Sequence, residues 1–424
     1  MLTLQTEFMQ NKETGFVFPN YAKNCILNIP KTVLNIFEPK KYQSPLKNKV
    51  NMNSKNINKV ALIVVDGLGF NQFLRHHEQN RFLSNLTSKG EVYPLTSVYP
   101  SQTTNALTTL NTGLTPQEHG LFEYFIYLKE VGVVNALRFE RIDAKKRNLV
   151  EEGFDPKIMF KGRNIQQTLT QEGIQTFTHM HTSNASNACT KLVFEGSTIV
   201  PTLKTSDAIV KLRKNIEKNK GSAYFFVHLE TLDTISHEYG PQSAEFTAEL
   251  QSISHLLQKE LVEKINAESA SETLILITAD HGAVQVDPNQ TTYQNLEAAP
   301  LLNRAFGKNR KRILPTGGPR DIFLHIKDEK LAETKQALSQ KIGKKAQILE
   351  TKEAIQNGLF GVGDANPEFI ERAGNLLILP YKKEAVWFEG PDGRKIDFLG
   401  QHGGLSEEEM VVPFAIAKLC DLKR

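Results

Sequence analysis

Six residues with metal-binding side chains stand beside short apolar runs of this 424-residue sequence, in motifs such as VVDGLG, TADHG and GQHGG. Carboxylate oxygens and imidazole nitrogens are ligands that Zn²⁺ and Mn²⁺ accept. Six of them are about the number that two ions need if positions stay open for water or substrate. Paired ions are the usual device for in-line displacement at phosphorus. The six residues are Asp66, Asp233, His237, Asp280, His281 and His402.

The spacing of these residues supports a shared site. Asp233 and His237 are four positions apart, so one turn of helix would place both side chains on the same face. Asp280 and His281 are adjacent, and a tight turn after a strand can aim both at one ion or at two neighbouring ions. Taken alone, each motif has a plainer interpretation, such as a turn at Asp66 or a surface contact for an i,i+4 Asp–His pair. All of these motifs in one chain are hard to explain as coincidence.

Seven other histidines lack this setting beside glycine at the end of an apolar run. We therefore interpret them as surface or core residues that take no part in the chemistry. They are His76, His77, His179, His181, His228, His255 and His325.

A hydroxyl-rich stretch, YPSQTTNALTTLNTGLTPQEHG, spans residues 99–120. Its interior, TTNALTTL, predicts the first turns of a helix. A helix N-terminus offers free N–H groups and a positive dipole end, which favour a bound phosphate. A free threonine hydroxyl is a poor nucleophile, but a metal ion can activate it without a separate base. We expect His119, at the end of the stretch, to fix the loop that follows the helix.

The elements that must position these residues are strands and helices in alternation. Four apolar runs, rich in Val, Ile and Phe, have the length of buried strands, and helical patterns lie between them at 164–173 and 244–265. This order predicts an α/β fold with a mostly parallel sheet, in which ligands gather at the carboxyl ends of the strands. Most of the Asp and His residues above would sit there. The apolar runs are 60–65, 222–230, 273–279 and 411–417.

The chain divides into three predicted parts. Residues 1–56 form an irregular N-terminal arm that leads to the first strand. Residues 57–309 and 396–424 form the catalytic domain. Residues 310–395 contain strand and helix patterns of their own, such as RDIFLHI, DEKLAETKQALSQKI and GNLLILP. We interpret this segment as a small α+β cap inserted into the main fold.

Composition excludes several classes of protein. The formal net charge is +4, which argues weakly for anionic ligands, and no segment has the Lys/Arg density of a nucleic-acid-binding tail. We therefore expect no stable nucleic-acid complex. No apolar run approaches the ~18 residues of a membrane span, and the N-terminal residues lack the apolar segment of a signal peptide. The three cysteines, Cys25, Cys189 and Cys420, form no disulfide framework. We expect a cytoplasmic protein.

The ordered set of motifs resembles the type I phosphodiesterase/nucleotide pyrophosphatase branch of the alkaline phosphatase superfamily. VVDGLG, the 99–120 stretch, LDTISHEYGP, TADHG and GQHGG match in order over roughly residues 58–415. The resemblance implies a three-layer sandwich with helices on both faces of the central sheet, and two metal ions, commonly zinc. It assigns one ion to Asp66, Asp280, His281 and the oxygen of the nucleophile. It assigns the other ion to Asp233, His237 and His402.

The resemblance also implies a nucleophile. In this family a Thr or Ser three residues after a proline caps a helix and attacks phosphorus, and Pro100 places Thr103 at that position. Thr104 is the alternative nucleophile. Relatives often carry an Asn shortly after the HG that contacts a phosphate oxygen. Tyr124 stands here instead, and its phenol can also donate a hydrogen bond. Arg320 is either an anion contact or a structural residue.

The expected activity is hydrolysis of a small phosphate ester, such as a nucleotide, by a metal-dependent phosphodiesterase that forms a phosphothreonine intermediate at Thr103. Water would then release a phosphomonoester. A phosphomonoesterase or a phosphonate hydrolase on the same site remains an alternative. A catalytically silent, metal-containing binding module is another alternative, although such a module has no need of a nucleophile.

Overall fold

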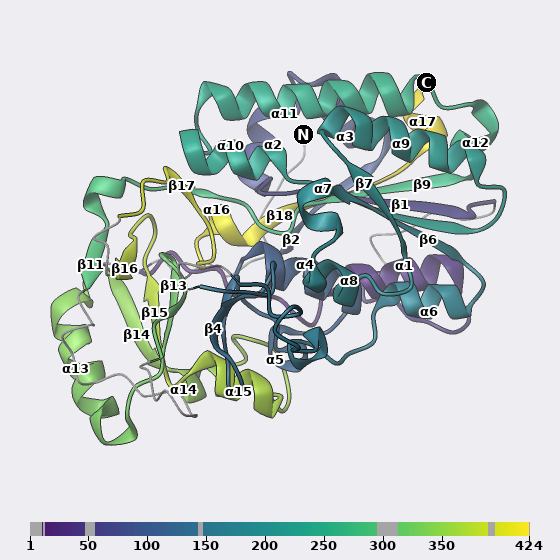
Figure 1. The fold of residues 1–424 in the computed structure, drawn as a ribbon. Helices are drawn as coiled ribbons and strands as arrows, with labels where there is room; N and C mark the ends of the chain where they lie inside the picture. The colour runs from purple at the N-terminus through teal and green to yellow at the C-terminus, as the bar shows by residue number, and fades with distance from the viewer. Residues whose placement is uncertain are drawn as a thin grey trace.

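A seven-stranded sheet forms the centre of the molecule (Figure 1). This computed structural model describes residues 11, 13–46, 56–142, 147–294, 313–388 and 395–423. The strands follow one another across the sheet in the order β2-β18-β9-β1-β8-β6-β7. They are β1 (Lys59–Val65), β2 (Glu91–Thr96), β6 (Gln175–His181), β7 (Thr198–Thr202), β8 (Ala223–Leu229), β9 (Thr273–Thr278) and β18 (Val411–Lys418).

One strand of the sheet runs against the others. β1 pairs in parallel with β8 and β9, and β6 pairs in parallel with β7 and β8. β18 lies between β2 and β9 and is antiparallel to both. The mostly parallel sheet predicted from the sequence is therefore confirmed. The amino end of β18 lies at the edge of the sheet where the other six strands have their carboxyl ends.

Burial explains why these runs become strands. β1, β8 and β9 are buried along their whole lengths, and their Val, Ile and Phe side chains pack well on the two covered faces of a sheet.

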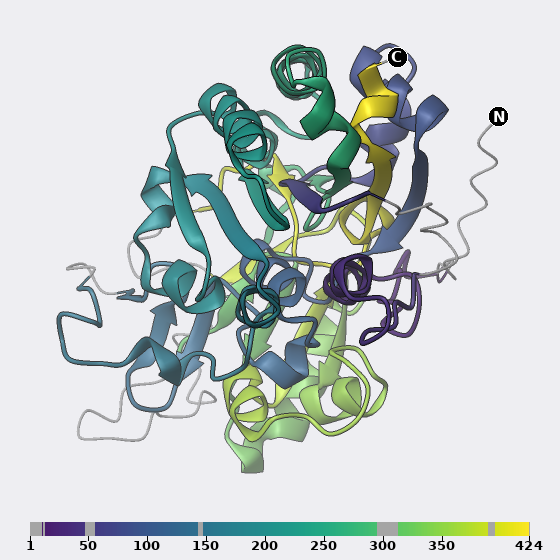
Figure 2. The same cartoon turned by 90° about the vertical axis from the view of Figure 1, so that its right-hand side faces the viewer.

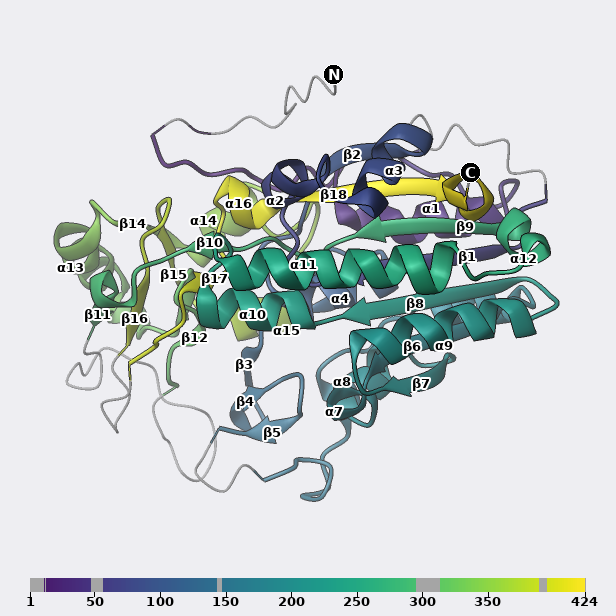
Figure 3. The ribbon, with the colours of Figure 1, turned by 90° about the horizontal axis from the view of Figure 1, so that it is seen from above.

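Helices cover both faces of the sheet and make the predicted three layers (Figures 1 and 2). One face carries α3 (Arg81–Lys89), α9 (Thr205–Lys218), α11 (Ala244–Leu256) and α17 (Leu419–Lys423). The other face carries α1 (Ile29–Phe37), α4 (Thr103–Thr112) and α6 (Ile165–Gln171). Figure 3 shows α11 and α9 lying over the sheet, nearly along its strands.

Two helical predictions need correction. The helix predicted over 244–265 is α-helical only as far as Leu256 and continues as a π-helix, η4 (Leu257–Val262), which buries Leu257, Leu261 and Val262 together.

The N-terminal arm is not irregular throughout, because a 3₁₀ turn, η1 (Ile26–Asn28), leads into α1. Pro30 stands in the first turn of α1, where its missing N–H costs nothing. Parts of the arm at 1–10, 12 and 47–55 lie outside the described residues.

A smaller antiparallel sheet lies beside one end of the main sheet (Figure 3). Its order is β12-β13-β15-β14, and α13 (Leu331–Ile342) packs on it over a separate apolar core that includes Ile322, Ile378 and Leu338. These elements fall inside the segment predicted as a cap, of which 310–312 and 389–394 lie outside the described residues. The strands are β12 (Thr316–Gly318), β13 (Asp321–Leu324), β14 (Ala346–Glu350) and β15 (Leu376–Pro380).

The boundaries of the predicted cap remain predictions, and two contacts tie the segment to the rest of the chain. β11 (Thr292–Gln294), from the range assigned to the main domain, pairs in parallel with β16 (Val386–Phe388). Phe360 and Phe369, from the cap range, belong to the large core of the central sheet. Across the described ranges, no helix has both the length and the apolar character needed to cross a membrane.

Candidate active site

The predicted ligands come together at one edge of the main sheet. Asp66 follows the carboxyl end of β1, and Asp280 follows that of β9. Asp233 lies on α10 (Thr231–Tyr239), which begins just after β8. His402 precedes β18, whose reversed direction brings its amino end to the same edge. The structure thus brings the six predicted ligands together, and we call Asp66, Asp233, His237, Asp280, His281 and His402 the ligand cluster.

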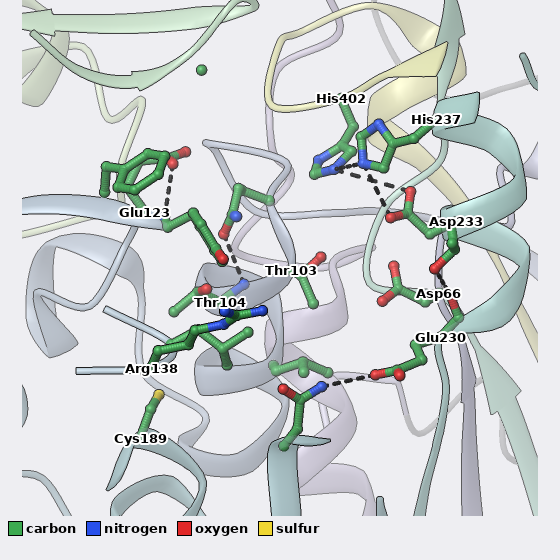
Figure 4. Close-up of a pocket in the computed structure, with 18 of the residues that line it drawn as sticks. Asp66, Thr103, Thr104, Glu123, Arg138, Cys189, Glu230, Asp233, His237 and His402 are labelled. Carbon is green, nitrogen blue, oxygen red and sulfur yellow. Dashed lines mark hydrogen bonds and ion pairs between the residues drawn. The ribbon is translucent and has the colours of Figure 1, made fainter. Parts of the chain in front are cut away.

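Asp233, His237 and His402 form one half of the ligand cluster (Figure 4). Nε2 of His237 lies 3.2 Å from Oδ2 of Asp233 and 3.2 Å from Nε2 of His402. Nδ1 of His237 lies 2.8 Å from the carbonyl oxygen of Gly400, and Nδ1 of His402 lies 3.1 Å from that of Ser101. A carbonyl only accepts, so both Nδ1 atoms donate. The Nε2 atoms therefore point toward Asp233 and toward each other, as metal-ligating imidazoles do.

The electrostatics of this half depend on Asp233. Burial lowers the pKa of His237. The Asp233 carboxylate outweighs this effect and raises the pKa of His237 to about 9. Burial and the neighbouring imidazole of His281 lower the pKa of His402 to about 3. Burial raises the pKa of Asp233, yet the imidazoles around it, His237 first, lower it overall. A cation at this point, whether a proton or a metal ion, is what keeps the carboxylate charged.

Asp66, Asp280 and His281 form the other half of the ligand cluster, and Thr103 lies beside it. Nε2 of His281 lies 3.0 Å from Oγ1 of Thr103, 3.2 Å from Oδ2 of Asp280 and 3.5 Å from Oδ1 of Asp66. Burial, and then the charges of Asp280 and Asp233, raise the pKa of Asp66 well above its ordinary value. Two buried carboxylates this close to each other call for a cation between them.

Unpaired oxygens test whether the ligand cluster fits metal ions. Oδ1 of Asp66, Oδ1 of Asp233 and Oδ2 of Asp280 are buried and accept no hydrogen bond from any described residue. Leaving a charged oxygen buried without a partner is costly. Two divalent cations, one beside Asp66 and Asp280 and one beside Asp233, would satisfy these oxygens, so the donor set fits the ions that the sequence predicts.

The distances place His281 within reach of both ion sites that the resemblance assigns. The ligand atoms of Asp233, His281 and His402 lie within 4.8 Å of one another, and so do those of Asp66, Asp280 and His228. His281 stands between the two halves, with its ring stacked on that of His402 at a centroid distance of 3.7 Å. With His237, seven groups therefore form one continuous cluster of candidate ligands.

His228 is the residue that the sequence analysis missed. It is buried, as expected for a core residue, but its Nε2 lies 2.9 Å from Oδ2 of Asp66. In the parallel register of β1 and β8, Val64 faces His228, so Asp66 follows just beyond. The available signal was a lone imidazole near the carboxyl end of an otherwise apolar strand. His179, on the neighbouring strand β6, contacts Asn215 instead.

The helix predicted from TTNALTTL is α4, and Thr103 is its first residue. The side chain of Gln102 caps it by accepting from the backbone N–H of Thr104 at 2.7 Å, and Gly113 ends it with φ 68°. Ser101 fixes the approach, because its hydroxyl donates to the carbonyl oxygen of Gly404 at 2.7 Å. This bond ties the Thr103 segment to the loop of His402.

A cavity of about 540 Å³ opens beside the ligand cluster and Thr103 (Figure 4). Tyr124 lines it, as a substrate contact would. Glu123 and Asp321 line it too, and burial raises the pKa of Glu123 to about 7 and, together with Glu123, that of Asp321. Arg320 is outside this lining.

Arg320 is structural, the second of its two predicted roles. It is fully buried, and its Nε and Nη2 donate to the two carboxylate oxygens of Glu409 at 2.9 and 2.7 Å. Glu409 in turn accepts from the backbone N–H of Gly404 at 3.0 Å. The pair therefore supports the loop that carries His402.

Comparison with known proteins gives a family model described as type I phosphodiesterase/nucleotide pyrophosphatase, which matches residues 60–405. Venom phosphodiesterase CdcPDE of Crotalus durissus collilineatus is 25% identical over 201 residues, which are 46% of this chain and 23% of that protein. Venom phosphodiesterase 2 of Crotalus adamanteus is 24% identical over a segment of the same size. The match thus spans about a quarter of the length of these curated relatives.

Solved structures share the fold at low sequence identity. Murine ectonucleotide pyrophosphatase/phosphodiesterase 5 has a TM-score of 0.61 at 16% identity, over 84% of this chain and 87% of that one. Phosphonoacetate hydrolase from Sinorhizobium meliloti 1021, in complex with phosphonoformate, has a TM-score of 0.60 at 14% identity, over 87% of this chain and 94% of that one. These similarities support the alkaline-phosphatase-like arrangement of the sheet and its helices.

Proposed function

Because the chain belongs to the type I phosphodiesterase/nucleotide pyrophosphatase family, we propose that it hydrolyses small phosphodiesters with two divalent metal ions at the carboxyl edge of its main sheet. The observation that carries the proposal is the position of Thr103. Thr103 is the first residue of α4 and lines the cavity, and its hydroxyl oxygen lies 3.0 Å from Nε2 of His281. A hydroxyl at a helix N-terminus, beside buried carboxylates and imidazoles, is where a phosphoryl group can be bound and attacked.

The ligand cluster would hold the two ions. Asp66, Asp280 and His281, with the oxygen of Thr103, form the first set. Asp233, His237 and His402 form the second set. Zn²⁺ suits such a mixture of oxygen and nitrogen ligands, and Mn²⁺ is the alternative. When bound, divalent ions polarise phosphoryl oxygens and lower the pKa of a coordinated hydroxyl.

The residues of the chain then perform a double displacement. Nδ1 of His281 lies 2.9 Å from the carbonyl oxygen of Gly282, so Nδ1 donates and Nε2 stays unprotonated for the metal ion that His281 would hold. The proton of Thr103 would pass to solvent. The threonine oxygen forms a bond to phosphorus while the bond to the leaving oxygen breaks. The N-terminal N–H groups of α4 stabilise the charge that develops on the phosphoryl oxygens. Water then breaks the phosphothreonine bond and releases a phosphomonoester.

Tyr124 would help to hold the phosphoryl group. It lines the same cavity as Thr103, and its phenol can donate one hydrogen bond to a phosphate oxygen. The substrate class would be small phosphate esters such as nucleotides. An inactive variant of the murine protein named above has been solved in complex with AMP, which supports testing nucleotide esters.

A paired hydrolysis assay tests the proposal. Purified, zinc-loaded protein is given bis(p-nitrophenyl) phosphate and p-nitrophenyl phosphate at equal concentrations, with Thr103→Ala, Thr104→Ala and chelator-treated protein beside it. Faster release of nitrophenol from the diester, lost on chelation and in Thr103→Ala but kept in Thr104→Ala, is the expected result. Preference for the monoester would indicate a phosphomonoesterase. Full activity in Thr103→Ala would overturn the mechanism.

A further inference from the structure

One arginine stands among the acidic residues of the cavity. Of the described residues that line it, Arg138 is the sole arginine or lysine, whereas Glu123, Glu230 and Asp321 add carboxyl groups to those of the ligand cluster. Figure 4 shows the Arg138 side chain extending into the cavity toward Thr104. An arginine is charged at any physiological pH. A substrate in this cavity therefore meets a permanent cation outside the ligand cluster.

The backbone holds Arg138 firmly in place. It lies in the turn between β4 (Gly132–Asn135) and β5 (Glu140–Arg141), where its N–H donates to Oδ1 of Asn135 at 3.0 Å. The next residue, Phe139, is fully buried and has φ 54°. A bulky residue in this left-handed region is strained, and the surrounding packing must over-determine it. Phe139 thus fixes the backbone of Arg138 beside the cavity, while the exposed side chain of Arg138 can reach a ligand there.

None of the described residues is a partner that would give Arg138 a structural role. Within the described parts of the chain, its guanidinium makes no hydrogen bond or ion pair. Arg141, three residues later, is the contrast, because its Nη2 lies 2.7 Å from Oε2 of Glu152 and its Nε donates to the same carboxylate. As far as the described residues go, the arginine that faces the cavity is thus the one without a partner.

Apolar surface flanks both Thr103 and Arg138. Leu107, one helical turn after Thr103, lines the cavity, and so does Leu137, next to Arg138. Val193 and Phe194, both buried, line it too. A ligand whose phosphorus lies at Thr103 and whose far end reaches Arg138 therefore shares the cavity with these apolar side chains.

We propose that Arg138 binds a second anionic group on the organic substituent of the phosphoester, so that this protein favours substrates with an apolar segment between two anionic groups. This inference rests on the proposed function, because it places the reacting phosphoryl group at Thr103. It makes Arg138 a specificity residue, with no part in the displacement at phosphorus. The second anion is a carboxylate or a phosphate, since a guanidinium binds either one with two parallel hydrogen bonds.

Binding to a variant that cannot turn over tests the inference. Calorimetry on zinc-loaded Thr103→Ala protein compares phenyl phosphate with 4-carboxyphenyl, 4-(carboxymethyl)phenyl and 4-(2-carboxyethyl)phenyl phosphate, and with 1,4-phenylene bisphosphate. We expect at least one two-anion ligand to bind roughly fivefold to tenfold more tightly than phenyl phosphate. Adding Arg138→Gln should remove this preference and leave the affinity for phenyl phosphate within about twofold.

The matched control is Arg81→Gln, which neutralises an arginine whose side chain is 70% exposed and which is outside the cavity lining. It should keep the preference. Equal affinities for all five ligands, or a preference that survives Arg138→Gln, would overturn the inference. Because the measurement needs no turnover, a protein that hydrolyses no diester but still prefers two anions through Arg138 would refute the proposed function alone.

Discussion

Oγ1 of Thr103 lies 3.0 Å from Nε2 of His281, although 178 positions separate the two residues in the chain. The carbonyl oxygen of Gly282 orients the imidazole by accepting from its Nδ1. The start of α4 and the turn after β9 are thus in contact before any ligand binds. Such preorganisation lets the site bind a phosphoryl group with little rearrangement.

The hydroxyl of Thr103 can be tested without changing the shape of the side chain. Thr103→Val keeps the volume and removes the hydroxyl, so we expect diester hydrolysis to fall by roughly 10³-fold or more. Thr103→Ser keeps the hydroxyl and should stay within about tenfold of the original protein. Steady-state rates on bis(p-nitrophenyl) phosphate give both values. Equal rates for the Val and Ser variants would rule out a nucleophilic role.

His228 should matter for metal affinity rather than for folding alone. Because it fixes Oδ2 of Asp66 at 2.9 Å, His228→Asn should weaken binding of one of two ions by about 10- to 100-fold. Competition with a chromophoric chelator measures the two affinities. His179→Asn is the matched control, since His179 is another fully buried histidine, on the adjacent strand β6. If both variants bind metal equally, His228 is only a core residue.

The buried pair of Arg320 and Glu409 should be expensive to break on one side. Both side chains are fully buried. Burial raises the pKa of Glu409, but the charge of Arg320 and the hydrogen bonds to the carboxylate together lower this pKa below its ordinary value. Glu409→Gln leaves the guanidinium charge buried without its partner, which typically costs about 3–5 kcal/mol. Urea denaturation gives the free energy of unfolding. The double variant Arg320→Met with Glu409→Leu should lose less than the single one, and a larger loss would contradict this account.

Stability should fall in acid because of His119. Burial, and then the Arg372 charge, lower its pKa to about 3. Its Nδ1 accepts from the N–H of Leu121 at 3.1 Å, and its Nε2 lies 3.1 Å from Oγ1 of Thr109. The neutral ring therefore fits this site, and the unfolded chain binds the proton first. The contribution of the neutral His119 to the free energy of unfolding is fully present above the unfolded pKa of about 6.5, and it is lost as the pH falls toward 3.

The measurement for His119 is a pair of urea titrations, at pH 7 and pH 5. The original protein should lose about 2 kcal/mol more than His119→Gln between these two values. The amide of Gln can accept and donate as the neutral imidazole does, but it does not titrate. An equal loss in both proteins would show that His119 does not govern the acid response.

The sequence predicted the strand ends and their ligands well, for a physical reason. An apolar run that stops at Asp or His has few interpretations other than a buried strand with a polar end, as at Asp66 and Asp280. The direction of β18 could not be predicted, because an apolar strand looks the same from either end. Because β18 is reversed, the loop that precedes it, which carries His402, lies at the same edge of the sheet as the other ligands.

Other features depend on contacts that no local pattern announces. A histidine inside an apolar run is read as a core residue, so the contact of His228 with Asp66 was missed. The partnership of Arg320 with Glu409 joins residues 89 positions apart, and each alone resembles a solvated charge. The helix α1 was missed although its nine residues are amphipathic, because it is short and lies in an arm whose other described residues form no helix or strand of comparable length.

The place of β18 in the sheet has a consequence for synthesis on the ribosome. β2, which leads into Thr103, pairs with β18 on one side and has no other strand neighbour within the described chain. β18 and the His402 loop come after every other element of the site in chain order. During synthesis, more than 300 residues must still be translated after Thr103 before β18 is complete. Until then, β2 and the Thr103 segment lack their partner strand in the sheet. The nascent protein can complete its active site only when β18 has left the exit tunnel and has inserted between β2 and β9.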